Sequence, residues 1–156
     1  MLPLLTVRIQ SEPFDAAAEI EALSRLGEDV GAVTSFTGFC RSEGGRLAAL
    51  ELEHYPGMAE EEIGSVVAEA VSRWPLYGVT VIHRHGVMRP SDGIVLVVTA
   101  SSHRTASFEA ANFVMDYLKT RAPFWKKEHR VDGSLGDWVA AKSDDDALAA
   151  RWKLDG

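Results

Sequence analysis

Hydrophobic residues follow two different spacings along the chain, and the change between them predicts where strands and helices lie. Residues 50–54 alternate between apolar and acidic or aromatic types at every second position, as expected of a strand with one buried face. Ile63, Val66 and Ala70 recur at the three- and four-residue spacing of an amphipathic helix. The apolar run 94–100 is rich in β-branched residues and too short to cross a membrane, which indicates a buried strand.

Capping and helix-breaking residues set the boundaries of these elements. Asp15 is a typical N-cap with Gly27 beyond the last turn, and Pro75 and Pro123 end the next two helices. The predicted strands cover residues 4–9, 31–40, 47–55, 79–83, 94–100, 124–131 and 137–141. The predicted helices run from Asp15 toward Gly27, over 58–74, between His103 and Pro123, and from one of Asp144, Asp145 or Asp146 through Leu148 and Trp152.

This order of elements predicts an α+β fold in a single domain over residues 1–156. No internal repeat or long linker divides the chain, and strands that follow each other directly favour antiparallel pairing. Periodicity alone is compatible with a ferredoxin-like sandwich and with a more barrelled variant.

Charge and cysteine content narrow the classes of partner and compartment. The formal net charge of -7 argues against general binding to nucleic acid or to an anionic membrane, so any anion site must be a local cluster of cations. The apolar start lacks a basic leader, and the single cysteine allows neither an internal disulfide nor a thiolate metal cage. We expect a cytoplasmic protein.

The corner at His103 and Arg104 is the strongest functional signal that the residues give by themselves. A helix start favours acidic side chains, so two potential cations there are unfavourable unless an anion binds. Free backbone N–H groups at the same place would help to hold a phosphate or a carboxylate.

Lys119 has a structural and a catalytic interpretation. As a surface residue it would pair with Asp116, one turn earlier on the helix. If Arg121, Trp125 and Lys126 crowd the same corner, its charged form is disfavoured and it could act as a base or nucleophile.

Lys126 and Lys127 must point to opposite faces of the predicted strand. The simpler interpretation is an edge strand that lysines protect from aggregation. Nearby residues add weaker candidates. Arg41 can join an anion site or be solvated, and Cys40 lacks a neighbouring base. His83 and His85 have the spacing of metal ligands but no third ligand close in sequence, so no metal is predicted.

Five ordered segments resemble the large, catalytic subunit of molybdopterin synthase. They are Gly-Ala-Val-Thr-Ser-Phe-Thr-Gly-Phe-Cys-Arg at 31–41, Leu-Glu-His-Tyr-Pro-Gly-Met-Ala at 52–59, Val-Ile-His-Arg-His-Gly at 81–86, Ser-His-Arg-Thr-Ala-Ser-Phe-Glu-Ala at 102–110, and Asp-Tyr-Leu-Lys-Thr-Arg-Ala-Pro-Phe-Trp-Lys-Lys-Glu at 116–128.

The resemblance implies an α/β-hammerhead fold and a sulfurtransferase of molybdenum cofactor biosynthesis. It implies a homodimer that binds a small ubiquitin-like sulfur-carrier subunit at each end, giving a heterotetramer. The C-terminal glycine thiocarboxylate of the carrier would supply two sulfurs in succession to cyclic pyranopterin monophosphate, forming the molybdopterin dithiolene. No cofactor is expected.

The resemblance also assigns roles to individual residues. Lys119 and Lys126 match the catalytic lysines, and we expect Lys119 nearer the thiocarboxylate and Lys126 nearer the pterin. The residues matched to substrate binding are Phe39, Cys40, Arg41, His103, Arg104, Lys127 and Glu128.

Two other functions remain open from the sequence. One is a non-catalytic subunit that binds a phosphate ligand, which would not need both lysines. The other is a sulfurtransferase that carries a persulfide on Cys40, which substitution by serine would inactivate.

Overall fold

The computed structural model describes residues 2–121, 123–140 and 150–153. Its strands are β1 (Leu4–Gln10), β2 (Ala32–Phe39), β3 (Leu47–His54), β4 (Leu76–Arg84), β5 (Gly86–Met88), β6 (Gly93–Ser101) and β7 (Phe124–Arg130). Its helices are α1 (Ala16–Ser24), α2 (Met58–Arg73) and α3 (Arg104–Arg121).

The described strands form two sheets. The larger has the order β1-β4-β6-β2, and the smaller has the order β5-β3-β7. β1 pairs with β4 in parallel, whereas β4 with β6, β2 with β6, and β3 with both of its neighbours are antiparallel. The predicted α+β fold with mostly antiparallel pairing is therefore confirmed.

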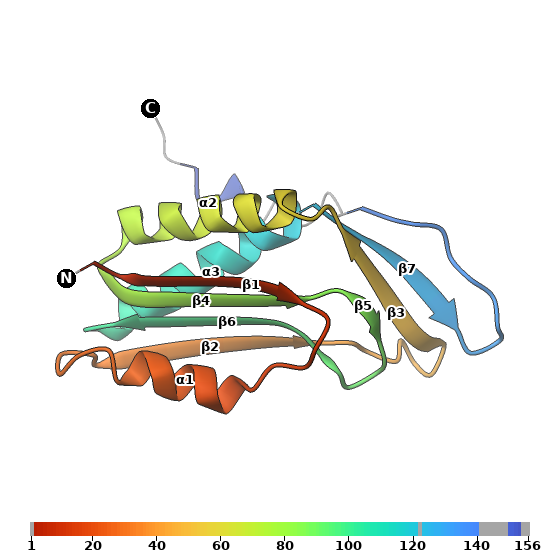
Figure 1. Ribbon diagram of the computed structural model, residues 1–156, viewed down its shortest axis with the longest axis horizontal. Coiled ribbons are helices and arrows are strands. Elements are labelled where there is room, and N and C mark those ends of the chain that lie inside the picture. The colour runs from red at the N-terminus through yellow and green to blue at the C-terminus, as the bar shows by residue number, and fades with distance from the viewer. Residues whose placement is uncertain (1, 122, 141–149, 154–156) are drawn as a thin grey trace.

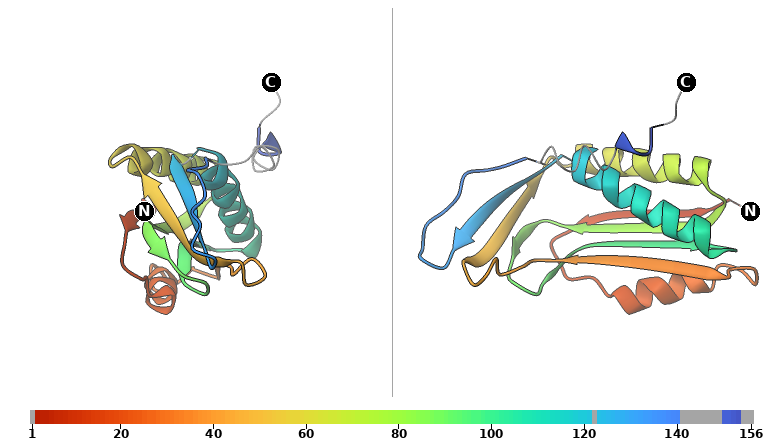
Figure 2. Two further views of the ribbon diagram at one scale, coloured as in Figure 1. Left: turned by 90° about the vertical axis from the view of Figure 1, so that its right-hand side faces the viewer. Right: turned by 180° about the vertical axis from the view of Figure 1, so that it is seen from behind.

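Helices cover both faces of the larger sheet (Figures 1 and 2). Val79, Val81 and Val97 point to the face covered by α2 and α3, while Ile82 and Leu96 point to the face covered by α1. Both faces of β4 and β6 are thus apolar, as expected of strands buried on both sides. Because helices lie on both faces, the chain does not adopt the plain two-layer sandwich that periodicity allowed.

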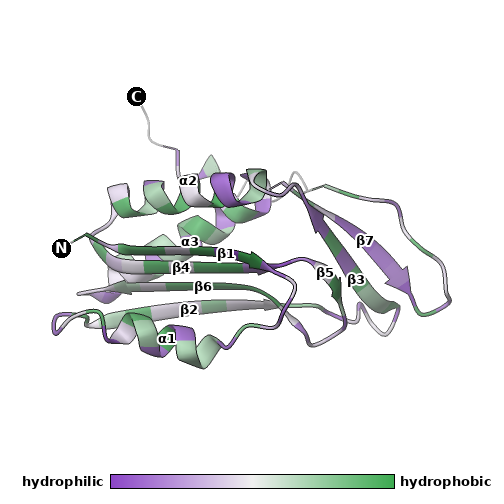
Figure 3. Ribbon diagram, viewed as in Figure 1, coloured by the Kyte–Doolittle hydropathy of each residue, from purple (hydrophilic) through white to green (hydrophobic). Residues whose placement is uncertain are grey.

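The smaller sheet extends from one end of the larger one (Figure 1). Its strand β7 is mostly hydrophilic, in contrast to β4 and β6 (Figure 3). The outer edge of β7 is partly paired, because Lys126 and Val139 exchange backbone hydrogen bonds of 2.9 and 2.8 Å. β7 is the edge strand of the smaller sheet, as the simpler interpretation of its lysines expects, and only isolated bridges cover its outer side.

The predicted elements differ from the structure in three places. β5 was not predicted, because three residues are too few to show an alternating pattern. In place of the strand expected at 137–141, the described residues of this segment make one isolated bridge to β7 at Val139, and Leu135 in the preceding loop makes another. The predicted terminal helix with Leu148 lies outside the described residues, apart from Trp152, which packs against Trp74 and Phe113.

No helix in the described ranges is both long and apolar enough to cross a membrane.

Candidate active site

The first turn of α3 is fixed to the sheet by buried hydroxyl groups. Thr99 Oγ1 donates to the backbone oxygen of Ser107 at 2.7 Å, and Ser107 Oγ donates to Thr34 Oγ1 at 2.7 Å. These contacts join α3 to β6 and β2 in a region that excludes water, where each unmade hydrogen bond would be costly. The larger sheet therefore fixes the start of α3.

His103 and Arg104 lie exposed at the start of α3. The first turn of the helix contains no acidic residue, and Ser101 Oγ donates to the backbone oxygen of His103. The corner is therefore electropositive and open, which is compatible with the predicted anion site.

A small cavity of about 80 Å³ lies at the other end of α3. It is formed where α3, β2, β4 and β6 meet. Its lining comprises Gly38, Phe39, His83, Ile94, Val95, Met115, Leu118 and Lys119. Two of the predicted site residues, Phe39 and Lys119, are thus brought together, although they are far apart in sequence.

His83 is the titratable group most strongly perturbed by this environment. Its half-buried ring stacks on Phe124 with centroids 3.8 Å apart, and its Nδ1 lies 2.9 Å from the backbone oxygen of Arg84. Burial, the largest cause, lowers the pKa of His83 from 6.5 to about 4, and the charge of Lys119 acts in the same direction. The imidazole is therefore neutral at pH 7.

Lys126 does not line this cavity, but it lies on β7 with Phe124, whose ring stacks on the cavity residue His83. It follows Phe124 by two residues on β7, so both side chains leave the same face of the strand, opposite Leu52 and His54. Lys127 points to the other face, where its Nζ lies 5.5 Å from the centre of the Trp138 ring. The two lysines face opposite ways, as predicted.

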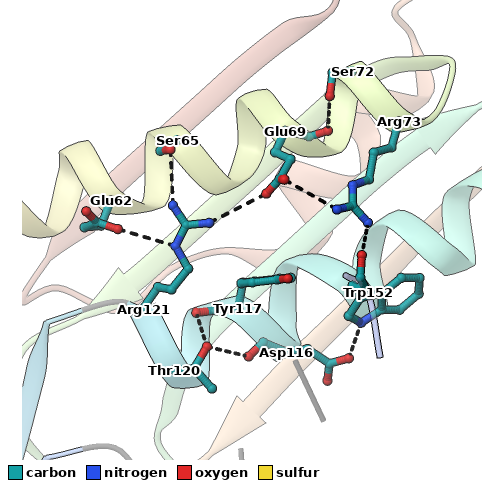
Figure 4. A network of polar contacts seen from close by, with 10 residues as sticks. All are labelled: Glu62, Ser65, Glu69, Ser72, Arg73, Asp116, Tyr117, Thr120, Arg121 and Trp152. Carbon is teal, nitrogen blue, oxygen red and sulfur yellow. Dashed lines mark hydrogen bonds and ion pairs between the residues drawn. The ribbon is translucent and has the colours of Figure 1, made fainter. Parts of the chain in front are cut away.

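Asp116 does not pair with Lys119, which corrects the structural interpretation of that lysine. Its carboxylate accepts hydrogen bonds from Trp152 Nε1 and, at 2.7 to 3.0 Å, from Arg151 (Figure 4 draws the Trp152 contact). Among the described residues Lys119 makes no ion pair, and it is exposed. None of the described residues buries Lys119, so its desolvation requires a further group.

Two residues expected to crowd Lys119 lie elsewhere. Arg121 turns toward α2, with Glu62 and Glu69 each 3.6 Å away (Figure 4). Trp125 leaves the opposite face of β7 from Phe124 and packs edge-on against Tyr55 at 6.0 Å. The cavity is walled instead by Phe39, His83 and Met115.

The remaining predicted site residues make local contacts. Exposed Arg41 lies 3.2 Å from Glu43. Glu128 receives two hydrogen bonds of 3.1 Å from Arg46, and these lower its pKa. Cys40 is only 4% exposed, and burial, assisted by the charge of Asp92, raises the pKa of its thiol. A buried thiol that resists ionisation is poorly suited to carry a persulfide.

Comparison with known proteins identifies the family. A family model described as MoaE protein matches residues 9–121. The molybdopterin synthase catalytic subunit of Mesorhizobium japonicum is 70% identical over 148 residues, which cover 95% of this chain and 93% of that protein. The chain belongs to the MoaE family.

Solved structures agree with this assignment. A molybdopterin biosynthesis MoaE protein from Burkholderia ambifaria superposes with a TM-score of 0.84 at 48% identity, covering 97% of this chain and 100% of that one. Molybdopterin synthase from Staphylococcus aureus gives a TM-score of 0.77 at 31% identity, covering 85% and 96%. The α/β-hammerhead fold expected of MoaE proteins is therefore the fold of this chain.

Membership of the MoaE family also gives the activity. The relatives are catalytic subunits of molybdopterin synthase, so the chain is a sulfurtransferase subunit of molybdenum cofactor biosynthesis.

The cations expected to form one MoaE site are separated within a single chain. At 1.5 Å of rise per residue, the stretch of α3 between Arg104 and Lys119 is about 22 Å long. His103 and Arg104 therefore cannot reach the cavity beside Lys119 in the same chain.

Sequence analysis missed the importance of His83 and Met115 in this MoaE protein. No pattern in the sequence assigns Met115 to the site, and the spacing of His83 and His85 indicates only a possible metal ligand. The described residues contain no cluster of three or more potential metal ligands. One signal was available for His83, because a titratable residue within an apolar strand is unusual unless it has a partner or a function.

Proposed function

We propose that this chain transfers sulfur from the C-terminal thiocarboxylate of a small ubiquitin-like carrier to cyclic pyranopterin monophosphate. Two transfers in succession form the dithiolene of molybdopterin. The observation that carries this proposal is the cavity that joins Lys119 of α3 to Phe39 of β2 and His83 of β4, with Phe124 of β7 stacked on His83. The only cysteine is buried, so the sulfur must come from a partner.

The size of the cavity fits the end of a carrier that terminates in glycine. A volume of about 80 Å³ holds roughly two to three water molecules, at about 30 Å³ each in the liquid. A peptide end without a side chain is small enough to enter. Exposed Lys119 at the lining then places a positive charge beside the entering thiocarboxylate.

Docking of the carrier supplies the desolvation that the chain alone lacks. Covering exposed Lys119 with protein surface disfavours its charged form and prepares it to transfer a proton or to act as a nucleophile. In each transfer the thiocarboxylate sulfur bonds to a carbon of the pterin substrate and displaces an oxygen substituent from that carbon, which joins carrier and substrate as a thioester. Water then attacks the acyl carbon, either directly or after a transient amide with Lys119, and this attack breaks the carbon–sulfur bond. Sulfur stays on the pterin, and the carrier leaves with an ordinary carboxylate.

The substrate phosphate is held by His103 and Arg104 of a second copy of the chain. These cations lie too far from Lys119 in their own chain, whereas a homodimer can place them beside the cavity of the partner. Phe39, the last residue of β2, lines the cavity, and Arg41 follows it by two residues. With one carrier at each cavity, the assembly is a heterotetramer.

Lys126 completes the catalytic pair, on the pterin side of the site. Lys127, Glu128 and Cys40, which the family resemblance assigns to substrate binding, do not line the cavity and remain part of the proposal on that resemblance alone. The proposal includes a single domain over residues 1–156, a cytoplasmic location, and no role for a metal or a cofactor.

Substitution of Lys119 by alanine tests the assignment of this lysine. General acid–base or nucleophilic groups typically contribute 100-fold or more, so Lys119→Ala should lower dithiolene formation by at least about 100-fold. Lys153→Ala, which removes another exposed lysine remote from the cavity, should leave the rate unchanged. Full turnover by Lys119→Ala with thiocarboxylated carrier would remove Lys119 from the mechanism.

A further inference from the structure

His83 occupies a position in the cavity that the proposed sulfur transfer does not yet use. It is the cavity residue contributed by β4, and it lies opposite the α3 residues Met115 and Lys119. Stacking on Phe124 fixes the plane of its ring. A titratable group that is held in one orientation and reaches the site of chemistry can contact whatever enters.

The hydrogen bond at Nδ1 determines which nitrogen carries the proton. The backbone oxygen of Arg84 can only accept, so Nδ1, at 2.9 Å from it, must be the donor. In a neutral imidazole the other nitrogen, Nε2, then holds a lone pair. Among the described residues Nε2 has no hydrogen-bond partner, and it is not a fully buried atom.

The neighbours of His83 keep the ring neutral. Lys119 from α3, His54 from β3 and His85 beside β5 all disfavour a further positive charge there. No carboxylate contributes to stabilising the imidazolium. The lone pair of Nε2 is therefore a permanent acceptor, and only a donor can satisfy it.

The occupant of the cavity provides such a donor. Lys119 itself makes no hydrogen bond to His83 in the described structure. A carrier peptide that enters by its C-terminal glycine brings a thiocarboxylate, which only accepts, and the N–H of its last peptide bond, which donates. When the anionic thiocarboxylate turns toward Lys119, the N–H of the last peptide bond is the donor available to the side of the cavity that contains His83.

We propose that His83 determines specificity in the carrier site, with its Nε2 accepting a hydrogen bond from the last backbone N–H of the carrier. This inference rests on the proposed function. The contact fixes the orientation of the terminal glycine, so that the thiocarboxylate points toward Lys119. The contact also favours a carrier whose last peptide bond has an N–H, and it excludes a carrier whose C-terminal end lacks this N–H.

Binding of a carrier with an ordinary C-terminal carboxylate tests the contact without requiring turnover. Two semisynthetic carriers are compared, one natural and one in which an ester replaces the last amide, so that only the N–H is lost. Wild-type chain should bind the ester carrier about tenfold more weakly, the usual effect of leaving an acceptor unpaired. His83→Phe, which retains stacking on Phe124 but lacks an acceptor, should bind both carriers alike.

A second variant separates the acceptor from the shape of the ring. His83→Gln places an amide oxygen near the position of Nε2, and it should retain most of the preference for the amide carrier. Thermal unfolding establishes that each variant is folded. If His83→Phe does not fold, the affinities of wild-type chain for the amide and ester carriers still test the inference. Equal affinity for the two carriers would overturn it.

Persistence of the preference in His83→Phe would also overturn the inference, because another group would then accept the N–H. Dithiolene formation by wild-type chain is measured in parallel. If product forms while the two carriers bind alike, His83 is not the acceptor but the proposed function stands. If no product forms, the proposed function itself fails.

Discussion

At the scale of single residues, the buried imidazole of His83 links stability to pH. Its pKa is 6.5 when unfolded and about 4 when folded, so the unfolded state gains a proton first as pH falls from 6.5 toward 4. The contribution of His83 to the free energy of unfolding is therefore fully present above pH 6.5. It decreases as pH falls through this window and is lost completely below about pH 4. A difference of about 2.5 pKa units corresponds to about 3 kcal/mol.

Urea unfolding at pH 7 and pH 4 measures this effect. Wild-type chain should lose about 3 kcal/mol more than His83→Phe between the two pH values, because the carboxylates that titrate below pH 5 are common to both. An equal loss in the two proteins would show that His83 is not buried as a neutral group.

Cys40 offers a test of where the sulfur originates. Its sulfur lies 3.8 Å from the backbone oxygens of Met88 and Arg41, so a serine at this position has acceptors within reach. Cys40→Ser should therefore fold and should form dithiolene within about twofold of the wild-type rate when thiocarboxylated carrier is supplied. Loss of sulfur transfer in a folded Cys40→Ser chain would indicate a persulfide on Cys40.

At the scale of secondary-structure elements, the last turns of α3 are held by the C-terminal segment. Arg151 and Trp152 bind the buried carboxylate of Asp116, and Arg73 of α2 donates to the backbone oxygen of Trp152 at 2.6 Å (Figure 4). Asp116 lies one turn before Lys119, so this cluster stabilises the end of the helix that carries Lys119.

Removing the charge of Asp116 tests this support. Asp116→Asn should lower the free energy of unfolding by about 2 kcal/mol, because it weakens two hydrogen bonds to a buried charged group. Glu21→Gln, which breaks the exposed pair between Glu21 and Arg25, should cost less than about 0.5 kcal/mol. Equal effects of the two substitutions in denaturant unfolding would contradict a supporting role for Asp116.

Local signals in the sequence predict where helices and strands lie better than they predict which of these elements pack side by side. Asp15 caps α1 as expected, since its carboxylate accepts from the backbone N–H of Ala18 at 3.1 Å. The parallel pairing of β1 with β4 joins segments that are far apart in sequence, and no local pattern encodes it. For the same reason, proximity to Lys119 in sequence did not reveal that Arg121 turns to α2 while Phe39 approaches from β2.

At the scale of the whole molecule, the proposed site needs two copies of the chain, because the length of α3 separates Lys119 from His103 and Arg104 within each copy. The sequence could mark these three residues as candidates, because each stands in a motif that resembles the family. It could not show how far apart they lie, because that distance depends on the length and direction of a helix in the folded structure.

Mixing two inactive variants tests this composite site. A chain carrying Arg104→Ala and a chain carrying Lys119→Ala should each be inactive alone. After exchange of subunits, half of the dimers contain both chains, and each of these has one intact site of two. About a quarter of wild-type activity should therefore return. Failure to recover activity, when mass spectrometry confirms mixed dimers, would place both cation clusters outside a shared site.

The most direct measurement of the central claim is product formation in a reconstituted reaction. Purified chain is mixed with thiocarboxylated carrier and cyclic pyranopterin monophosphate, and dithiolene is quantified together with spent carrier. The account predicts dithiolene from the wild-type chain, with two carriers converted to the carboxylate form for each product, and none from Lys119→Ala. Absence of dithiolene from the wild-type chain, under conditions in which an established synthase forms it, would contradict the account.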